Sequence, residues 1–424
     1  MRILVVSTLY PPAVRGGYEV ECADVVQRLR GRHEVLVLTS DHPLPGPADE
    51  ELVVRELPFL SYRKRDSIAA PRNAVRAART ADRLLEAFRP DLLYVWNGSQ
   101  IPQAALRVLD RSGVPVAYRI CQHWFASMYL SDEFMRYLYP GERGLRRMWG
   151  LLMRAANRHP ALRLNPTTVV PAAVCWNSDA LRTVAPEPPT VEPIYEDKIY
   201  PATHQSELFR DVARSPAAEP TVLFSGRVSA EKGPDVAYRA LAALRDRHGI
   251  DARLVLAGEA DPAMARRLEA LGAELGIHDR VELLGRVGGQ ELVPLLAQAH
   301  LMVIPSVWEE PAPLVATEGA LARVPIVASR VGGIPEMLHP EEHALYFGVG
   351  DADGCAAAMA ETLTRPQETL ARVERAHIRG EELALPSYLQ ATERFLTNAV
   401  AALEDRMRSG NPALSVARGA RVQP

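Results

Sequence analysis

The chain has 424 residues, more than one hydrophobic core usually supports, and we therefore expect two domains. Its net charge of −3 argues against a nucleic-acid partner, which would need a dense basic surface. The 47% hydrophobic share is ordinary for a globular protein, and no apolar run approaches the roughly 20 residues that span a membrane.

The four cysteines are scattered without the spacing of metal ligands: Cys22, Cys121, Cys175 and Cys355. We expect reduced thiols, as in a cytoplasmic protein, rather than a disulfide framework. The first residues, "MRILVVSTLY", are too short and too β-branched for a signal peptide. These features predict a cytoplasmic location and leave the oligomeric state open.

Strand-like and helical segments alternate along the first half of the chain. Apolar, β-branched runs stand at 2–8, 33–40, 91–96 and 114–120. Helical periodicity lies between them, at 17–30, 73–88 and 100–112. This βαβ rhythm predicts a parallel sheet with helices on both faces.

The rhythm stops between residues 185 and 220, in a stretch rich in proline and glutamate that includes "APEPPTVEPIYEDKIYPATH". Such a composition is typical of a connection without regular structure. We interpret it as the join between two domains, 1–205 and 206–386.

After residue 220 the rhythm restarts. Strands are predicted at 221–226, 252–258, 281–285, 301–306 and 325–329, and helices at 234–247, 262–275, 289–298 and 313–322. A last amphipathic helix, 387–407, is expected to return to the first domain, and 408–424 to be a disordered tail. The fold class is therefore α/β, with two Rossmann-like doubly wound domains facing across a cleft that holds the ligand.

The stretch "LFSGRVSAEKGPDV" places two cations on one loop at the carboxyl end of a strand. The strand ends at Gly226, Arg227 and Lys232 follow, and Pro234 suits the first turn of the next helix. Two cations beside a helix N-terminus form a site for an anion, most plausibly a diphosphate. The alternative is a solvated loop in which Lys232 pairs with Glu231 or Asp235.

Residues 305–337 place two glutamates eight positions apart. Glu310 lies in the loop before a helix and Glu318 in its first turns. A carboxylate at a strand end accepts two hydrogen bonds from a vicinal diol, as in a sugar or ribose. The alternative is an acidic residue that complements the helix dipole.

Together, "SGR…EKG", "E-PAPLVAT-E" and "VPIVASRVGGIPE" resemble the donor half of glycosyltransferase family 4, closely over 220–365 and loosely over 1–180. The resemblance implies the GT-B fold and a retaining hexosyltransferase that needs no metal or other cofactor. The implied donor is a nucleotide-diphosphate sugar, most commonly a UDP-sugar. The implied acceptor is a hydroxyl of a glycan, a lipid or a small metabolite.

The resemblance also implies roles for individual residues of the second half. Arg227 and Lys232 would hold the diphosphate and stabilise the leaving group. Glu310 would lie near the donor sugar, and Glu318 would bind the ribose hydroxyls. Leu314 would offer its backbone N–H to the distal phosphate or the sugar.

Two further positions follow from the same resemblance. "RVELLGRV", 280–287, matches the loop near the nucleotide base and ends at Val287. Gly16 and Gly17 stand before the first helix, where backbone can approach a phosphate or an acceptor. The alternative for these glycines is a plain tight turn. A nicotinamide site is disfavoured, because no G-x-G-x-x-G follows the first strand.

The sequence departs from the family after the strand "VPVAYRI". The family usually has a His-Asp or His-Asn pair here, whereas this chain reads "CQHWF", with Cys121 at the histidine position and His123 two residues later. His123 either takes over the role, or is a buried, satisfied histidine while the role is lost. In the second case the chain is a catalytically inactive GT-B-like partner subunit. His300, where Asp is usual, and Arg323, where Gly is common, are smaller departures.

Residues 351–353 spell Asp-Ala-Asp, like the metal-binding motif of another glycosyltransferase fold. They stand at a predicted helix start, where aspartate caps a helix, and we favour that role over a metal site.

The basic excess of the first half gathers in residues 136–164, which hold seven Arg and one Glu among Met, Trp and Leu. One interpretation is an amphipathic helix in peripheral contact with the inner membrane face, reaching a lipid-linked acceptor. The other is an acceptor-domain helix with snorkelling arginines. We favour the second, because the apolar residues suffice for a core face.

Overall fold

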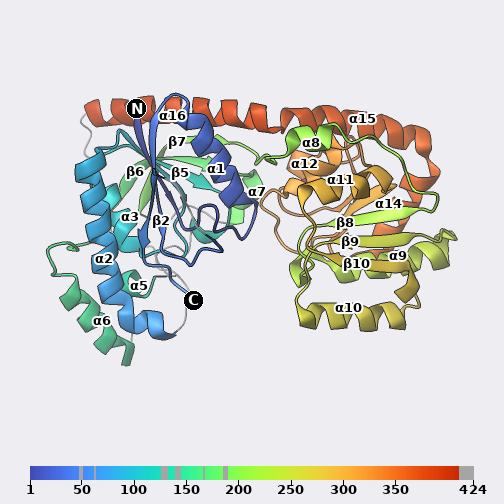
Figure 1. The fold of residues 1–424 in the computed structure, drawn as a ribbon, viewed down its shortest axis with the longest axis horizontal. Helices are drawn as coiled ribbons and strands as arrows, with labels where there is room; N and C mark the ends of the chain where they lie inside the picture. Colours follow the sequence, from blue (N-terminus) through green and yellow to red (C-terminus); the bar gives the residue numbers. More distant parts are fainter. Residues whose placement is uncertain are drawn as a thin grey trace. The chain divides into compact units, whose positions relative to one another are not determined.

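The computed structural model describes residues 1–46, 51–61, 64–125, 132–138, 145–165, 168–184 and 190–409. The chain forms two compact units (Figure 1). Unit 1 comprises Met1–Asn177, Leu181–Ile199 and the C-terminal segment from Leu389, and unit 2 comprises Ser178–Ala180 and Tyr200–Tyr388. The chain therefore passes into unit 2 at Ile199–Tyr200, six residues before the boundary inferred from the sequence.

Unit 1 contains a seven-stranded parallel sheet in the order β3-β2-β1-β4-β5-β6-β7. Its strands are β1 (Arg2–Ser7), β2 (Glu34–Ser40), β3 (Val53–Leu57), β4 (Leu92–Asn97), β5 (Val116–Ile120), β6 (Val170–Trp176) and β7 (Val191–Lys198). The central strands are buried along their whole length, as expected for a parallel sheet covered on both faces.

The helices of unit 1 are α1 (Gly17–Arg30), α2 (Lys64–Phe88), α3 (Gln103–Asp110), α5 (Glu133–Leu138), α6 (Leu145–Ala156) and α7 (Asp179–Val184), of which α7 begins within unit 2. Leu4 and Val6 of β1 share one core cluster with Ala77 of α2 and Leu106 of α3. Alternation along β1 thus turns one set of side chains toward α2 and α3.

Unit 2 contains a six-stranded parallel sheet in the order β10-β9-β8-β11-β12-β13. Its strands are β8 (Thr221–Ser225), β9 (Arg253–Ala257), β10 (Val281–Gly285), β11 (Leu301–Ile304), β12 (Ile326–Ser329) and β13 (Leu345–Phe347). Its helices are α8 (Ser206–Arg210), α9 (Pro234–His248), α10 (Pro262–Glu274), α11 (Gly289–Gln298), α12 (Leu314–Leu321), α13 (Ile334–Met337), α14 (Ala352–Thr364) and α15 (Pro366–Glu382).

Both sheets have the strand order of a doubly wound fold, which confirms the predicted α/β class with two doubly wound domains. The chain runs outward from the central strand to one edge and then returns to build the other half. The return makes β4 a neighbour of β1 in unit 1 and β11 a neighbour of β8 in unit 2. The loops after β8 and β11 therefore leave the same edge of the sheet side by side, at the point where open α/β sheets bind ligands.

The interpretation of 185–220 as a connection without regular structure is wrong in part. Residues 191–198 form β7, which pairs with β6 as an edge strand, and residues 206–210 form α8. Pro193 and the polar residues of β7 hid it in the sequence, because proline is tolerated on an edge strand and most of this strand is only half-buried. Helix α15 was also missed.

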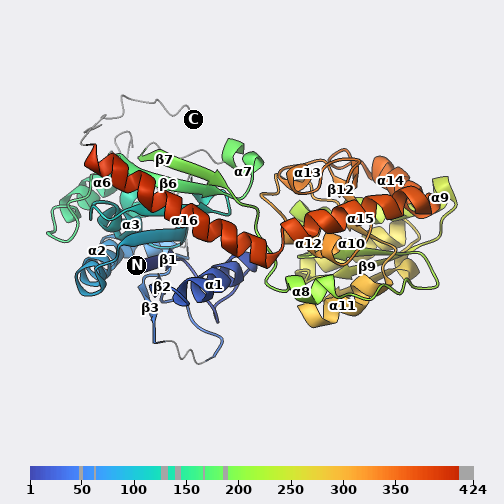
Figure 2. The ribbon, with the colours of Figure 1, turned by 90° about the horizontal axis from the view of Figure 1, so that it is seen from above.

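The last helix, α16 (Leu385–Arg408), begins in unit 2 and ends in unit 1, after α15 (Figure 2). The expected tail falls almost wholly on residues 410–424, which lie outside the described residues. No helix in the described part of the chain is long and apolar enough to cross a membrane.

Candidate active site

The loop after β8 is fastened to the loop after β11 by a close approach of backbone. Gly233, between the 3-10 turn Ala230–Lys232 and α9, has φ +64°, and a Cβ there would lie 2.0 Å from the carbonyl oxygen of Pro305. The Val307 N–H also donates to the Glu231 carbonyl at 2.9 Å. Only glycine combines this φ with this contact, which explains the Lys-Gly-Pro sequence.

Lys232 and Glu310 meet at this junction. The Lys232 Nζ lies 2.5 Å from Glu310 Oε1, and the Ser306 hydroxyl donates to the same oxygen at 2.6 Å. The Glu310 side chain is 3% exposed and the Lys232 side chain 22%. The Lys232 Nζ also lies 5.8 Å from the ring centroid of Trp308. A cation that keeps an exposed face is thus held by a buried carboxylate at the carboxyl edge of the sheet.

Arg227 is arranged differently from Lys232. It follows Gly226, is 67% exposed, and its guanidinium lies 3.4 Å from Glu231 Oε1. Asp235 pairs with Arg267, so the alternative in which Lys232 pairs with Glu231 or Asp235 is wrong. The two cations lie on one loop, as the sequence predicted, with different partners.

The loop that carries Glu310 packs against Gly332 and Gly333, two glycines for which the sequence predicted no role. The Gly333 N–H donates to the Glu310 carbonyl at 2.7 Å. A Cβ on Gly332 (φ +57°) would lie 2.2 Å from the Glu310 carbonyl oxygen, and a Cβ on Gly333 would lie 2.2 Å from that of Pro311. "VGGIPE" therefore positions Glu310 through backbone contact, because no side chain fits between the two loops.

Glu336, at the end of the same motif, binds the points where the chain enters unit 2. Its carboxylate accepts the N–H groups of Asp179 at 2.9 Å and Ala180 at 2.8 Å, and the Tyr200 hydroxyl at 3.3 Å. Glu336 thus links both segments where the chain enters unit 2, at Asp179–Ala180 and at Tyr200, to the glycine loop that contacts Glu310. A glutamate after Gly-Ile-Pro was the available signal, but its partners are more than 130 residues away.

Glu318 lies in the second turn of α12, four residues after Leu314 opens the helix behind Pro313. Burial raises the pKa of the Glu318 carboxyl to about 7, while a hydrogen bond with Thr203 lowers it. The carboxylate is therefore poorly solvated. The first N–H groups of α12, including that of Leu314, have no partner within the helix.

The remaining predicted positions of unit 2 lie where the fold explains them. Val287 follows β10 and packs, half-buried, against the core beside α11. His300 accepts the Thr221 N–H on Nδ1 at 3.1 Å, so it joins the starts of β11 and β8. Arg323 has φ +53°, which explains why glycine is common at this position.

The capping role favoured for residues 351–353 is confirmed. Asp351 is the N-cap of α14 and accepts the Gly354 N–H at 2.9 Å. Asp353 forms an exposed ion pair with Arg247 at 2.7 Å.

In unit 1, Gly16 and Gly17 open α1 and are exposed. The Gly16 N–H donates to Glu19 Oε2 at 2.9 Å. Burial raises the pKa of the Glu19 carboxyl, and it raises that of the neighbouring Tyr18 hydroxyl well above its usual value. The glycine pair is therefore an ordered helix start whose backbone is open to solvent.

The departure "CQHWF" follows β5. Cys121 is buried, burial raises the pKa of its thiol, and it contacts the Asn177 side chain. His123 is half-buried, while Trp124 and Phe125 belong to the core of unit 1. A buried neutral thiol does not replace a histidine in proton transfer or cation chemistry, so Cys121 does not take over that role, and a role for His123 stays a prediction.

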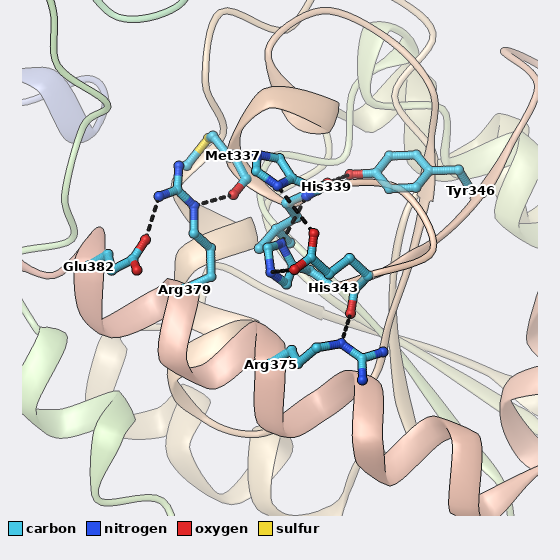
Figure 3. Close-up of polar contacts among 9 residues, drawn as sticks. Met337, His339, His343, Tyr346, Arg375, Arg379 and Glu382 are labelled. Atoms are coloured by element: carbon cyan, nitrogen blue, oxygen red, sulfur yellow. Dashed lines mark hydrogen bonds and ion pairs between the residues drawn. The ribbon is translucent and has the colours of Figure 1, made fainter.

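Among the described residues, one group of His, Cys, Asp and Glu side chains is close enough to hold a metal ion: His339, Glu342 and His343. Figure 3 labels the two histidines. The Glu342 oxygens lie 3.4 Å from His339 Nδ1 and 3.7 Å from His343 Nε2. The His339 N–H donates to His343 Nδ1 at 3.0 Å, so the neutral His343 ring carries its proton on Nε2. Nε2 is the atom that a metal would need, and the donor set therefore does not fit a metal ion.

Two family models match this chain. The one described as "Glycosyl transferases group 1" matches residues 205–379, and the one described as "Glycosyl transferase 4-like domain" matches residues 16–185. The first covers the β8–α9 and β11–α12 loops, and the second covers most of unit 1.

Curated relatives match over shorter stretches. A D-inositol 3-phosphate glycosyltransferase of Saccharomonospora viridis is 34% identical over 236 residues, which are 52% of this chain and 53% of that protein. An uncharacterized glycosyltransferase of Methanocaldococcus jannaschii is 36% identical over 146 residues, 34% and 36% of the two chains. The chain thus spans about half or less of the length of these relatives.

Solved structures match over nearly the whole chain. Sucrose-phosphate synthase from Thermosynechococcus elongatus is 20% identical with a TM-score of 0.68, over 95% of this chain and 99% of that one. HepE from Anabaena in complex with UDP is 20% identical with a TM-score of 0.64, over 94% and 100%. At this identity the likeness establishes the fold.

Proposed function

The chain belongs to glycosyltransferase family 4 and has its GT-B fold, and from this premise we propose that it is a retaining glycosyltransferase that uses a UDP-sugar. It transfers a hexosyl group to a hydroxyl of a glycan, a lipid or a small metabolite. The observation that carries the proposal is the Lys232–Glu310 pair at the switch point of the unit 2 sheet.

Lys232 has the charge and the setting to hold a diphosphate. Its ammonium keeps an exposed face while Glu310 and the Trp308 ring fix its position. Departure of the sugar builds negative charge on the diphosphate, and a cation already in place opposes that charge most strongly in the transition state. The protein groups supply this charge, so the proposed reaction needs no metal or other cofactor.

Arg227 supplies the second cation when the donor binds. An exposed ion pair such as Arg227–Glu231 contributes little to stability, so the guanidinium can exchange Glu231 for a diphosphate. A guanidinium fork beside a point-like ammonium suits two adjacent phosphates.

Glu318, Leu314 and Val287 hold the remaining parts of the donor. The poorly solvated Glu318 carboxylate accepts hydrogen bonds from the ribose diol, which replace the hydration that it has lost. The Leu314 N–H, at the start of α12, binds the distal phosphate or the sugar in this proposal. Val287, after β10, lies against the base.

Glu310 lies near the donor sugar and keeps Lys232 in place. The acceptor hydroxyl attacks from the face that the diphosphate leaves, and a phosphate oxygen takes its proton, so the anomeric configuration is retained. In this proposal Gly16 and Gly17 offer backbone to a phosphate or the acceptor, and His123 positions the donor sugar or the acceptor hydroxyl. The structures of HepE bound to UDP and to UDP-glucose support the choice of UDP as carrier.

A second candidate function rests on Cys121. This buried thiol stands where the family usually has a histidine, which favours a catalytically inactive GT-B-like partner subunit. Intact Lys232, Glu310 and Glu318 favour the enzyme.

A panel of nucleotide sugars tests the proposal. We expect a UDP-sugar to raise the melting temperature, because it binds the native state, and the same donor to be hydrolysed or transferred. Binding without turnover across an acceptor panel would favour the inactive subunit. The absence of any shift with UDP, GDP, ADP and TDP sugars would refute both.

A further inference from the structure

We propose that the side of unit 1 formed by α2 and α6 docks on the surface of a membrane that contains anionic lipids. The proposal concerns unit 1 alone and does not depend on the donor site. It rests on an exposed apolar ridge, on the absence of acidic residues from its segment, and on an arginine-lined cavity beside it.

Helix α6 turns its bulky apolar side chains outward. Four of them are exposed: Met148 (65%), Trp149 (40%), Leu151 (57%) and Leu152 (57%). The helix keeps a narrow buried seam at Gly150 and Met153. The expectation that the apolar residues of 136–164 form a core face is therefore wrong in part. Met153, Leu162 and Leu164 belong to the core of unit 1, whereas most of the apolar surface of α6 lies in solvent.

The segment around the ridge is purely basic. Residues 145–165 contain five arginines and no aspartate or glutamate. Arg154 and Arg158 are exposed at its end. An exposed apolar ridge with guanidinium groups at its C-terminal end matches a layer that is anionic outside and apolar below, as an anionic bilayer is. The rest of the stretch 136–164 includes residues 139–144, which lie outside the described residues.

A cavity of about 660 Å³ lies beside the ridge and is lined by one face of α2. Its arginines are spaced by four, three and four residues, as one helical face requires: Arg72, Arg76, Arg79 and Arg83. Glu56 is the one carboxylate in its lining. Four guanidinium forks around a cavity favour phosphate groups.

The charges of this cavity are only partly neutralised. Arg83 pairs with Glu56 at 2.6 Å, and Arg76 pairs with Asp41 at 2.8 Å. Arg79 lies against His159 Nε2 at 3.4 Å. Within the described part of the chain, Arg72 has no hydrogen-bond or ion-pair partner. The cavity therefore keeps a positive excess at neutral pH.

The ridge and the cavity form one continuous surface. Met148, Leu152 and Ala156 are spaced by four residues and so lie along one ridge of α6. Ala156 is also in the lining of the cavity, together with His159 just after the helix. Figures 1 and 2 show α6 near α2 at one end of unit 1. Apolar side chains thus insert beside the guanidinium groups that hold the lipid phosphates.

Co-sedimentation with lipid vesicles tests the proposal. We expect the protein to bind vesicles of phosphatidylcholine mixed with phosphatidylglycerol, to bind phosphatidylcholine alone far less, and to be released by salt. The double variant Met148→Ser/Leu152→Ser should weaken binding at least about tenfold. The double variant Arg72→Gln/Arg79→Gln should weaken it by about tenfold and reduce its dependence on salt.

A matched control removes apolar groups of equal exposure elsewhere. Leu370 and Ile378 on α15 are 61% and 63% exposed, and Leu370→Ser/Ile378→Ser should bind vesicles like the parent. All variants change exposed residues and should keep the melting temperature and nucleotide affinity of the parent.

Three results would overturn the proposal. One is no binding to anionic vesicles at low salt, and another is an equal loss of binding in the α15 control. The third is a dimer in sedimentation equilibrium that Met148→Ser/Leu152→Ser dissociates, which would make the ridge an interface between two copies of the chain.

Discussion

The ammonium group of Lys232 lies 2.5 Å from the carboxylate of Glu310, although 78 residues separate them in the chain. Parallel pairing of β8 with β11 brings their loops to one edge of the sheet, and Gly233 and the Gly332–Gly333 pair hold the two loops in contact. The pair therefore depends on backbone packing as much as on charge.

The Lys232–Glu310 pair should show energetic coupling. Lys232→Met leaves a buried carboxylate without its cation, so we expect the free energy of unfolding to fall by about 3 kcal/mol. Glu310→Gln leaves a lysine that reaches water and should cost less. The double variant should be more stable than the sum of the two losses implies, by about 1 kcal/mol or more in urea titrations. Strictly additive losses would contradict the contact.

The two cations of the β8–α9 loop should contribute unequally to turnover. Lys232→Ala should lower kcat by about a hundredfold or more, because it removes an ordered charge from the leaving group. Arg227→Ala should have a smaller effect on kcat, because the guanidinium is exposed and must first leave Glu231. Steady-state kinetics with the identified donor measures both.

Arg239→Ala provides the control, since Arg239 is exposed on α9 of the same unit. It should retain the kcat of the parent. A Lys232→Ala enzyme with nearly normal turnover would remove Lys232 from the mechanism.

The close contact between Gly332 and the backbone of Glu310 should not tolerate a methyl group. Gly332→Ala places a Cβ about 2.2 Å from the Glu310 carbonyl oxygen, so it should displace Glu310, lower kcat and reduce the melting temperature by several degrees. Gly350→Ala is the matched control, because Gly350 has φ +74° with nothing within 4 Å. Gly350→Ala should have the free-energy cost of an alanine at positive φ without a steric clash of its Cβ. Equal losses in both variants would show that the close approach is unimportant.

Glu318 should make stability fall as pH rises. Its pKa is about 7 in the folded chain against an ordinary 4.5, so the folded state holds a proton that the unfolded state has lost between these values. Glutamine does not titrate, so Glu318→Gln should not lose stability in this way. The difference in free energy of unfolding, variant minus parent, should therefore rise by up to about 3 kcal/mol from pH 4.5 to pH 8. Urea titrations at several pH values measure the difference.

Nucleotide binding gives an independent readout of the same group. Ribose hydroxyls that donate to Glu318 favour the carboxylate, so UDP binding near pH 6 should release protons, and Glu318→Gln should release fewer and bind more weakly. Calorimetry in two buffers of different ionisation enthalpy counts the protons. Glu274→Gln, an exposed position on α10, serves as control. Equal proton release by all three proteins would remove Glu318 from the nucleotide site.

The elements of the fold were largely predictable, because their signals are local. Apolar periodicity located α9, α10 and α11 to within about a residue, and the strand-end glycine located the loop of Lys232. β7 was missed because an edge strand needs little apolar surface and tolerates proline. The pairing of β7 with β6 depends on the order of the strands in the sheet, and no local pattern in residues 191–198 predicts it.

The site was predictable as a set of residues but not as a set of contacts. Spacing and residue type indicated Lys232, Glu310 and Glu318. The partners of Glu336 are backbone groups far away in the chain, so no local pattern reveals them. The high pKa of Glu318 likewise arises from burial by neighbouring segments.

The amino-acid sequence by itself determined where strands and helices alternate and which loops carry the charged residues, since hydrophobic periodicity and turn residues act over a few positions. Only the tertiary structure decided that Lys232 pairs with Glu310 while Arg227 pairs with Glu231, and that α6 turns Leu151 and Leu152 to solvent. The physical reason is the same in each case. Charge pairing and burial depend on which segments the sheet order brings together, and that order is a property of the whole chain.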